Sequence, residues 1–369
     1  MNKKKRNLLC SLILAAVLLG LLLYIDNSDL KSSMLSAVLQ KGAIYALVAV
    51  SMNLLNGFTG LFSLGQAGFM LLGAYTYAVF TIPVEQRIKV YQSFEGGLIQ
   101  FQMPMLLAIL LAGLVAALFA MLIGAPVLRL KSDYLAIATL GFAEIIRAVI
   151  QWDTLGPITN GSNLLRKFAK YDSILFPFII AGICILLVVL LINSTYGRAF
   201  KAIREDEIAA EAMGINLLKH KMIAFCTSSF FAGVGGALLA MFQSSVQAKF
   251  FNTNMTYEIL LIVVIGGIGS ITGSILGSFL YVACSEWWLR FLDNEVFIGS
   301  FKVPLLGNGF RMVVFSIVIM VVVLFYRKGL MGSREFSWDS FFGFFGKIGR
   351  FFQRLFGGKK AVKGGAVNE

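Results

Sequence analysis

The chain has 369 residues, of which 58% are hydrophobic and only 14% are charged, and its mean hydropathy is +0.82. A soluble domain is about a quarter charged, so this composition excludes an ordinary soluble protein and indicates a polytopic membrane protein. The net charge of +13 follows the alternation of loops across a membrane, so nucleic acid is not an expected partner.

Apolar segments recur along the whole chain. A transmembrane helix needs about 20 mostly apolar residues to cross a hydrocarbon core about 30 Å thick. The expected spans are 8–25, 34–56, 60–82, 103–125, 133–150, 174–193, 222–246, a glycine-rich region 257–290, and 308–326. Region 257–290 is too long for one simple helix, so we expect two short helices or a re-entrant hairpin. The sequence therefore predicts an all-α protein with about eight to ten transmembrane helices.

The first 32 residues are expected to form a cytoplasmic segment followed by a membrane anchor helix. If the basic residues 3–6 are cytoplasmic, then segments 126–132 and 196–221 and the tail after residue 326 are also cytoplasmic, and they carry most of the Lys and Arg. This positive-inside pattern predicts that both termini are cytoplasmic. No small-residue cleavage site clearly follows the first helix, so its removal as a signal peptide is not expected.

A first glycine-rich segment, NGFTGLFSLGQAGFMLLGAY, combines glycines with polar side chains. Irregular backbone at membrane depth is tolerated only against protein or a watery cavity. We therefore take Ser63, Gly65, Gln66 and Gly68 as candidates for a substrate path.

A second glycine-rich segment reads GGIGSITGSILGS. Glycines at four-residue spacing allow close packing of helices in lipid, and they equally permit an unwound helix beside a path. Both interpretations stay open for Gly266, Gly267, Gly269 and Gly273.

Several ionisable residues lie within apolar segments, where each is a candidate functional residue by default. Glu144 and Arg147 are three apart on one expected helix and can neutralise each other. Glu286 and Arg290, beside two tryptophans, are typical of an interfacial belt. Lys41, near a helix end, is expected to reach water. Two further residues of this kind are Glu258 and Arg311.

The sequence offers no catalytic or metal-binding constellation. His220, the only histidine, lies between two lysines and is expected at a helix start. The four cysteines lie in apolar stretches without the spacing of metal ligands or disulfides: Cys10, Cys184, Cys226 and Cys284.

The segment 196–221, YGRAFKAIREDEIAAEAMGINLLKHK, is too charged to lie in lipid. Its pattern predicts one amphipathic helix over 200–213 that ends at Gly214, which can adopt a left-handed conformation. Lys201 with Glu205, and Arg204 with Glu207 or Glu211, fall at the spacing of helix-stabilising pairs. Mixed charge suits anionic lipid poorly, so a docking helix for a soluble partner is favoured.

The C-terminal tail, residues 333–369, is basic and Phe-rich. Its phenylalanines recur near helical spacing with basic residues largely between them. This pattern is typical of an amphipathic helix in the inner leaflet interface that is attracted by anionic lipid.

The run REDEIAAEAMGIN resembles the cytoplasmic coupling loop of ATP-binding-cassette importer permeases. In the common form of that loop Glu-Ala-Ala precedes the glycine by a three-residue gap, whereas here Ile208 occupies the first position and Glu207 lies one place earlier. Four further segments resemble permeases of branched-chain amino-acid importers of the LivM type: NLLNGFTGLFSLGQAGFMLLGAYTYA, LRLKSDYLAIATLGFAEIIR, VIGGIGSITGSILGS and FYRKGLMG. The resemblance covers most of residues 42–332.

The resemblance implies a permease domain over residues 33–332 in a bacterial cell membrane. The implied partners are a related permease subunit, two cytoplasmic ATPases, and an extracellular or periplasmic substrate-binding protein. The implied substrates are leucine, isoleucine and valine. The chain lacks the G-x-x-x-x-G-K-[ST] phosphate loop, so ATP and Mg are expected in the partner ATPases and no cofactor in this chain.

By the same resemblance, one set of residues couples the permease to the ATPases: Arg198, Arg204, Glu205, Asp206, Glu207, Ala210 and Gly214. The alternatives are a related permease for urea or short amides and an ion-coupled secondary carrier that uses Glu144 and Glu258. A membrane-embedded enzyme and a structural scaffold fit the residues less well.

Overall fold

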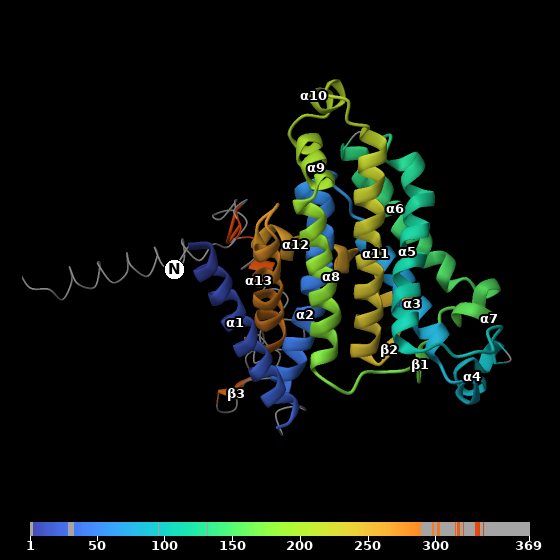
Figure 1. Ribbon diagram of the computed structural model, residues 1–369. Helices are drawn as coiled ribbons and strands as arrows, with labels where there is room; N and C mark the ends of the chain where they lie inside the picture. Colours follow the sequence, from blue (N-terminus) through green and yellow to red (C-terminus); the bar gives the residue numbers. More distant parts are fainter. Residues whose placement is uncertain are drawn as a thin grey trace, which may run out of the picture. The chain divides into compact units, whose positions relative to one another are not determined.

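The computed structural model describes residues 3–28, 33–94, 96–130, 132–288, 297–298, 301–302, 314, 316–317, 320, 329–332 and 335. The chain forms two compact units, Met1–Leu21 with Glu335–Glu369, and Leu22–Arg334. In the first unit the structure describes Glu335 and residues 3–21 of helix α1 (Lys3–Asp26). Residues 22–26 of α1 belong to the second unit. The second unit holds the other elements (Figure 1).

The second unit is almost entirely helical, as the sequence predicts. Its longer helices are α2 (Met34–Asn53), α3 (Gln66–Thr81), α5 (Met105–Val127), α6 (Ser132–Gln151), α8 (Leu175–Asn193), α9 (Thr195–Glu205), α11 (Leu217–Gln243), α12 (Thr253–Gly266) and α13 (Ile271–Val282). The short ones are α4 (Val84–Val90), α7 (Gly156–Thr159), α10 (Glu207–Ala212), the 3-10 turns η3 (Gln92–Phe94), η4 (Asp153–Leu155) and η5 (Ala248–Phe250), and the π-helical turns η2 (Leu54–Phe58) and η6 (Ala283–Trp287).

Two antiparallel strand pairs complete the described elements. Strand β1 (Leu165–Arg166) pairs with β2 (Ser245–Val246), with Leu165 opposite Val246. Strand β3 (Phe297–Ile298) pairs with β4 (Phe301–Lys302). Both pairs connect loops and leave the fold all-α.

Helix α11 lies at the centre of the bundle and packs against α5, α3 and α2. A Cβ on Gly73 of α3 would overlap the backbone of Gly233 in α11, and a Cβ on Gly233 would overlap Ala116 of α5. Helices in lipid associate through such close packing, because the hydrophobic effect gives no net attraction between them there. Small residues therefore set the spacing of the three central helices.

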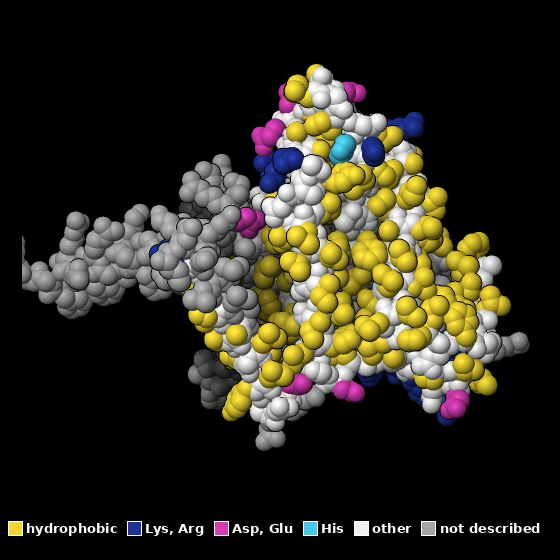
Figure 2. All heavy atoms as spheres, in the orientation of Figure 1, with side chains coloured by type: hydrophobic (Ala, Val, Ile, Leu, Met, Phe, Trp, Pro, Cys, Tyr) yellow, Lys and Arg dark blue, Asp and Glu magenta, His cyan; other side chains and the backbone are white. Residues whose placement is uncertain are grey.

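The outer faces of α5 and α8 are apolar and exposed, as lipid contact requires. Leu114 and Leu118 of α5, and Ile183 and Leu190 of α8, are about half exposed. Figure 2 shows hydrophobic side chains over the middle of this face, and charged ones gathered mainly at the α9–α10 end and at the opposite end. This distribution matches a hydrocarbon core between two polar interfaces.

Several of the described helices qualify as membrane spans. By length and apolar composition, five described helices can cross a membrane: Met34–Phe58, Met105–Val127, Tyr134–Gln151, Leu175–Asn193 and Leu217–Gln243. Two shorter apolar helices are Ala16–Asp26 and Thr253–Gly266. The count of eight to ten crossings stays a prediction.

The two glycine-rich segments break the helices in different ways. Region 257–290 begins with two short helices, α12 and α13, which confirms one of the two expected forms. Within the expected span 60–82, residues 60–65 are not helical and α3 begins only at Gln66. Gly60 has φ +75°, and the Asn56 amide accepts the Ser63 N–H at 3.1 Å in place of a helical carbonyl.

Other expectations fall outside the described residues. These are the conformation of the tail apart from Glu335, the environments of Arg290 and Arg311, and most of the span 308–326. His220 lies in the first turns of α11, as predicted, with its Nδ1 2.8 Å from the carbonyl oxygen of Asn216.

Candidate functional site

The charged segment forms two helices, so the prediction of one continuous helix over 200–213 is wrong. Asp206 interrupts it with an extended backbone, φ −159° and ψ 113°. Its carboxylate accepts the N–H groups of Ile208 and Ala209 at 2.8 and 3.0 Å. Aspartate competes with helical hydrogen bonding and is a preferred N-cap, so it ends α9 and starts α10.

The end of α10 confirms the predicted role of Gly214, which has φ +82°. The Gly214 N–H donates to the carbonyl of Glu211 at 2.9 Å, and the Ile215 N–H donates to that of Ala210 at 3.1 Å. A left-handed glycine closes a helix in this way without steric cost. We call residues 195–214, which hold α9 and α10, the coupling segment.

The charge pairs of the coupling segment differ from the predicted ones. Arg204 pairs with its neighbour Glu205 at 2.7 Å, and Glu207 pairs with Lys221 of α11 at 2.6 Å. Arg204 and Glu207 lie on separate helices, so the i, i+3 geometry expected between them is lost. The Glu207–Lys221 pair instead fixes the start of α10 against α11.

Helix α10 projects from one end of the bundle (Figure 1). Its apolar side chain Ile208 is 82% exposed, and the adjoining Met213 is 83% exposed. Ala210 faces inward and is buried, while Arg198 on α9 is exposed. Exposed apolar side chains amid charge at the tip of a helical turn are suited to the groove of a soluble partner.

Arg204 connects the coupling segment to the first glycine-rich segment. Its guanidinium donates to the carbonyl of Gly57 in η2 at 2.9 Å. The chain bends closely around Arg204, since a Cβ on Gly60 would approach the Arg204 Cγ to 2.8 Å. The Lys201 ammonium lies 5.8 Å from the ring centroid of Phe58, which gives α9 a second contact with η2.

Asn53 connects this segment in turn to the second glycine-rich segment. Its amide donates to the Ser270 carbonyl at 2.9 Å and to the Ser274 hydroxyl at 2.8 Å, and it accepts the Gly269 N–H at 2.8 Å. Asn53 is fully buried. The turn between α12 and α13 is therefore held through the side chain of one residue on α2.

The same turn contacts the described part of the C-terminal region. The N–H of Leu330 donates to the carbonyl of Ile265 at 2.7 Å, and that of Met331 donates to Gly266 at 3.1 Å. Three segments distant in sequence therefore meet at the end of α12. We call the group Arg204, Gly57, Asn53 and the turn 267–270 the junction.

The candidate path residues of the first segment are buried and bonded within the bundle. The Gln66 amide donates to the Ser51 hydroxyl at 2.6 Å. The side-chain amide of Asn56 accepts the Ser63 N–H and donates to the Ser63 carbonyl. A Cβ on Gly68 would overlap Ala143 of α6, and one on Gly65 would crowd Thr139.

In the second segment, Gly266 and Gly273 meet backbone to backbone, so that a Cβ on either would overlap the other residue. Gly267 and Gly269 have positive φ angles of +122° and +86°. Helix packing and turn geometry therefore explain why glycine occupies these positions. A role in a substrate path stays a prediction for the eight candidate residues of the two glycine-rich segments.

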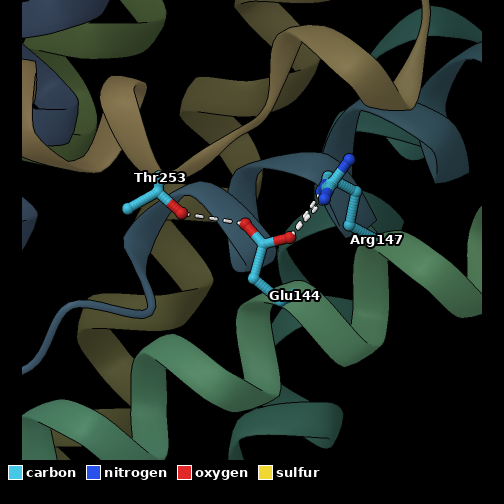
Figure 3. Close-up of polar contacts among 3 residues, drawn as sticks. All are labelled: Glu144, Arg147 and Thr253. Atoms are coloured by element: carbon cyan, nitrogen blue, oxygen red, sulfur yellow. Dashed lines mark hydrogen bonds and ion pairs between the residues drawn. The ribbon is translucent and has the colours of Figure 1, made fainter.

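Glu144 and Arg147 form the predicted pair, with Arg147 Nε 2.7 Å from a Glu144 carboxylate oxygen (Figure 3). Thr253, at the start of α12, donates its hydroxyl to the other carboxylate oxygen at 2.9 Å. Sequence reasoning missed this third partner, which ties α6 to α12. It also missed the salt bridge of Lys41 with Glu286, in which the Lys41 side chain stays 22% exposed. The sequence signal for this salt bridge was the presence of opposite charges, Lys41 and Glu286, in two apolar segments, where each charge needs a partner.

Comparisons with known proteins agree with this architecture. Residues 34–325 match the protein family described as "Branched-chain amino acid transport system / permease component". The "High-affinity branched-chain amino acid transport system permease protein LivM" of Salmonella typhimurium is 33% identical over 277 residues, which are 66% of this chain and 61% of that protein. The chain thus spans about 61% of the length of this relative and of its Escherichia coli counterpart.

Two more distant relatives extend the comparison. The "Probable branched-chain amino acid transport permease protein LivM" of Methanocaldococcus jannaschii is 25% identical over 82% of this chain and 94% of that protein. The "L-arabinose transport system permease protein AraH" of Escherichia coli is 27% identical over 55% of this chain and 61% of that protein. No solved structure matches the chain significantly. The family match covers well over half of the sequence, and the chain is therefore a multi-pass membrane protein that belongs to the family of permease components of branched-chain amino acid transport systems.

Proposed function

We propose that the chain is a transmembrane subunit of an ATP-driven importer for leucine, isoleucine and valine. It works with a related permease, two cytoplasmic ATPases and a substrate-binding protein on the outside. Family membership and the names of the LivM relatives support this proposal. The absence of a phosphate loop from the sequence assigns ATP hydrolysis to other polypeptides.

The observation that carries the mechanism is the hydrogen bond from Arg204 to Gly57. The coupling segment binds in a groove of the ATPase pair through Ile208, Met213 and the charged residues around them. When the ATPases close on ATP, the segment moves and Arg204 moves η2 with it. Asn53 passes this motion to the turn between α12 and α13.

The energy for this change comes from nucleotide, since a ligand shifts a conformational equilibrium only by its difference in affinity for the two states. The permease supplies two arrangements of the broken helices, and the ATPases bind one of them better. In this mechanism Arg198 and Glu205 contact the ATPase, and the cap residue Asp206 positions α10 for that contact. Glu207 and Ala210 hold α10 against the bundle, and Gly214 ends it.

The coupling segment is cytoplasmic in this proposal, as are both termini, and the end that carries β1 and β2 faces the binding protein. The basic residues favour this orientation. The tail 333–369 adds an attachment to anionic lipid beside the permease domain 33–332.

Reconstitution tests the proposal. The chain is co-expressed with a neighbouring permease, its ATPases and its binding protein, and the purified complex is placed in lipid vesicles with ATP on the coupling-segment side. ATP-dependent uptake of labelled leucine, with no uptake of urea or arabinose, supports it. Uptake that continues without ATP and stops when ion gradients are collapsed would support a secondary carrier instead.

A further inference from the structure

A polar cavity opens at the end of the bundle opposite the coupling segment. Its volume is about 500 Å³, within the range of roughly 300–1,000 Å³ that small-molecule sites occupy. It lies where the end of α11, the turn η5 and the start of α12 meet, with Tyr45 of α2 as a further wall.

Two charges of opposite sign line this cavity, Lys249 on η5 and Glu258 on α12. Lys249 is exposed and forms no salt bridge within the described part of the chain. Glu258 is half-buried, and the Lys41 ammonium and the Tyr281 hydroxyl lie near its carboxyl group. A carboxylate offers about four acceptor positions, so these neighbours leave Glu258 able to bind a further cation.

The remaining walls are partly apolar and aromatic and partly polar, with the side-chain amides of Gln243, Gln247, Asn252 and Asn254. Leu239, Phe250 and Met255 line the cavity together with Tyr45. The Tyr45 ring is held in place by stacking on Tyr281, with centroids 6.4 Å apart and planes 14° from parallel. An aliphatic side chain therefore finds an apolar surface beside both charges.

We infer that this cavity is an entry site for a free aliphatic amino acid. The substrate's carboxylate binds Lys249, its ammonium group binds Glu258, and its side chain lies against Tyr45 and Met255. The inference rests on the proposed function and adds a substrate-binding site to it.

The charges explain why such a site selects zwitterions. A zwitterion leaves water only where both of its charges are matched, and charge-assisted hydrogen bonds are the strong ones. Urea and sugars carry no such pair of charges and gain nothing from the arrangement.

Uptake by the reconstituted complex tests the site with Lys249→Gln and Glu258→Gln. At leucine concentrations below saturation each substitution lowers ATP-dependent uptake by about ten-fold or more, since ten-fold corresponds to the loss of one such contact. Lys249→Arg, which keeps the positive charge, retains most of the uptake. Lys170→Gln and Glu85→Gln are matched controls, because both side chains are exposed outside the cavity, Lys170 on a loop and Glu85 on α4.

A second measurement leaves both charges in place. Asn254, an exposed lining residue, is changed to Cys in a variant without the native cysteines and reacted with a polar thiol reagent. Leucine slows this reaction, whereas 4-methylpentanoate and 3-methylbutylamine, which each lack one of the two charges, slow it far less. Lys170→Cys reacts equally with and without leucine.

The outcomes separate the two proposals. Normal leucine uptake by both charge variants, or equal protection of Asn254→Cys by leucine and its single-charge analogues, overturns the entry site and leaves the proposed function standing. A wild-type complex that takes up no branched-chain amino acid overturns both.

Discussion

The guanidinium of Arg204 donates a hydrogen bond of 2.9 Å to the carbonyl of Gly57, which lies 147 positions earlier in the chain. This bond joins the coupling segment to the broken helix of the first glycine-rich segment. Because Gly57 is one turn from Asn53, and Asn53 holds the turn between α12 and α13, a displacement of α9 reaches both glycine-rich segments through three contacts.

Replacement of Arg204 by Ala is expected to separate ATP hydrolysis from transport. The variant removes the bond to Gly57 and leaves Ile208 and Met213 exposed for the ATPase. The ATPases should co-purify normally, while leucine uptake per ATP hydrolysed falls by about ten-fold, as for loss of one charge-assisted contact. Lys219→Ala, at an exposed position of α11, is the control. An unchanged ratio of uptake to hydrolysis in Arg204→Ala would remove the proposed transmission.

Replacement of Asp206 by Ala should loosen α10 by about 1 kcal/mol, the usual value of an N-cap. The N–H groups of Ile208 and Ala209 lose their acceptor. Hydrogen exchange of these two amides should quicken, and the affinity for the ATPases should fall. Asp206→Asn keeps an acceptor oxygen and should behave as wild type; the same loss in both variants would point to charge and not to capping.

Asn53→Leu should destabilise the protein by about 3 kcal/mol, because it leaves buried donors and acceptors without partners. The affected groups are the Gly269 N–H, the Ser270 carbonyl and the Ser274 hydroxyl, although the last two keep other bonds. Thermal unfolding in detergent measures the effect. The exposed Asn163 provides the control, since Asn163→Leu is expected to stay within about 0.5 kcal/mol of wild type. Equal melting temperatures for the two variants would contradict the role of Asn53.

Glu144→Gln and Arg147→Gln should each destabilise the protein, and the double variant should lose less than their sum. The pair and its Thr253 bond are made among apolar helices, where a single unpaired charge is costly. A double-mutant cycle on thermal stability should give a coupling energy of about 1 kcal/mol. Strict additivity would show that the two charges act independently.

The double variant also tests the rival mechanism. If Glu144 carries coupling ions, uptake should be lost even where the protein is stable. We expect ATP-driven uptake to survive in Glu144→Gln/Arg147→Gln, since both side chains serve to join α6 to α12.

Local patterns in the sequence were enough to predict most of the long described helices, the charged segment, its stop at Gly214 and the Glu144–Arg147 pair. Each depends on residues within a few positions of one another, where helix geometry alone sets the neighbours. The break at Asp206 was also a local signal, but helical periodicity across 200–213 concealed it. The resemblance to LivM-type permeases added the family, which the match over residues 34–325 confirmed.

Only the tertiary structure decided which distant groups meet. Contacts between separate elements include the hydrogen bond of Arg204 to Gly57, the bonds of Asn53 to the turn between α12 and α13, and the salt bridge of Lys41 with Glu286. The same packing brings Lys249 and Glu258 to the lining of one cavity. A polar group among apolar helices must find a partner because lipid offers none. The sequence shows that such a partner is needed, and helix packing determines which one lies within reach.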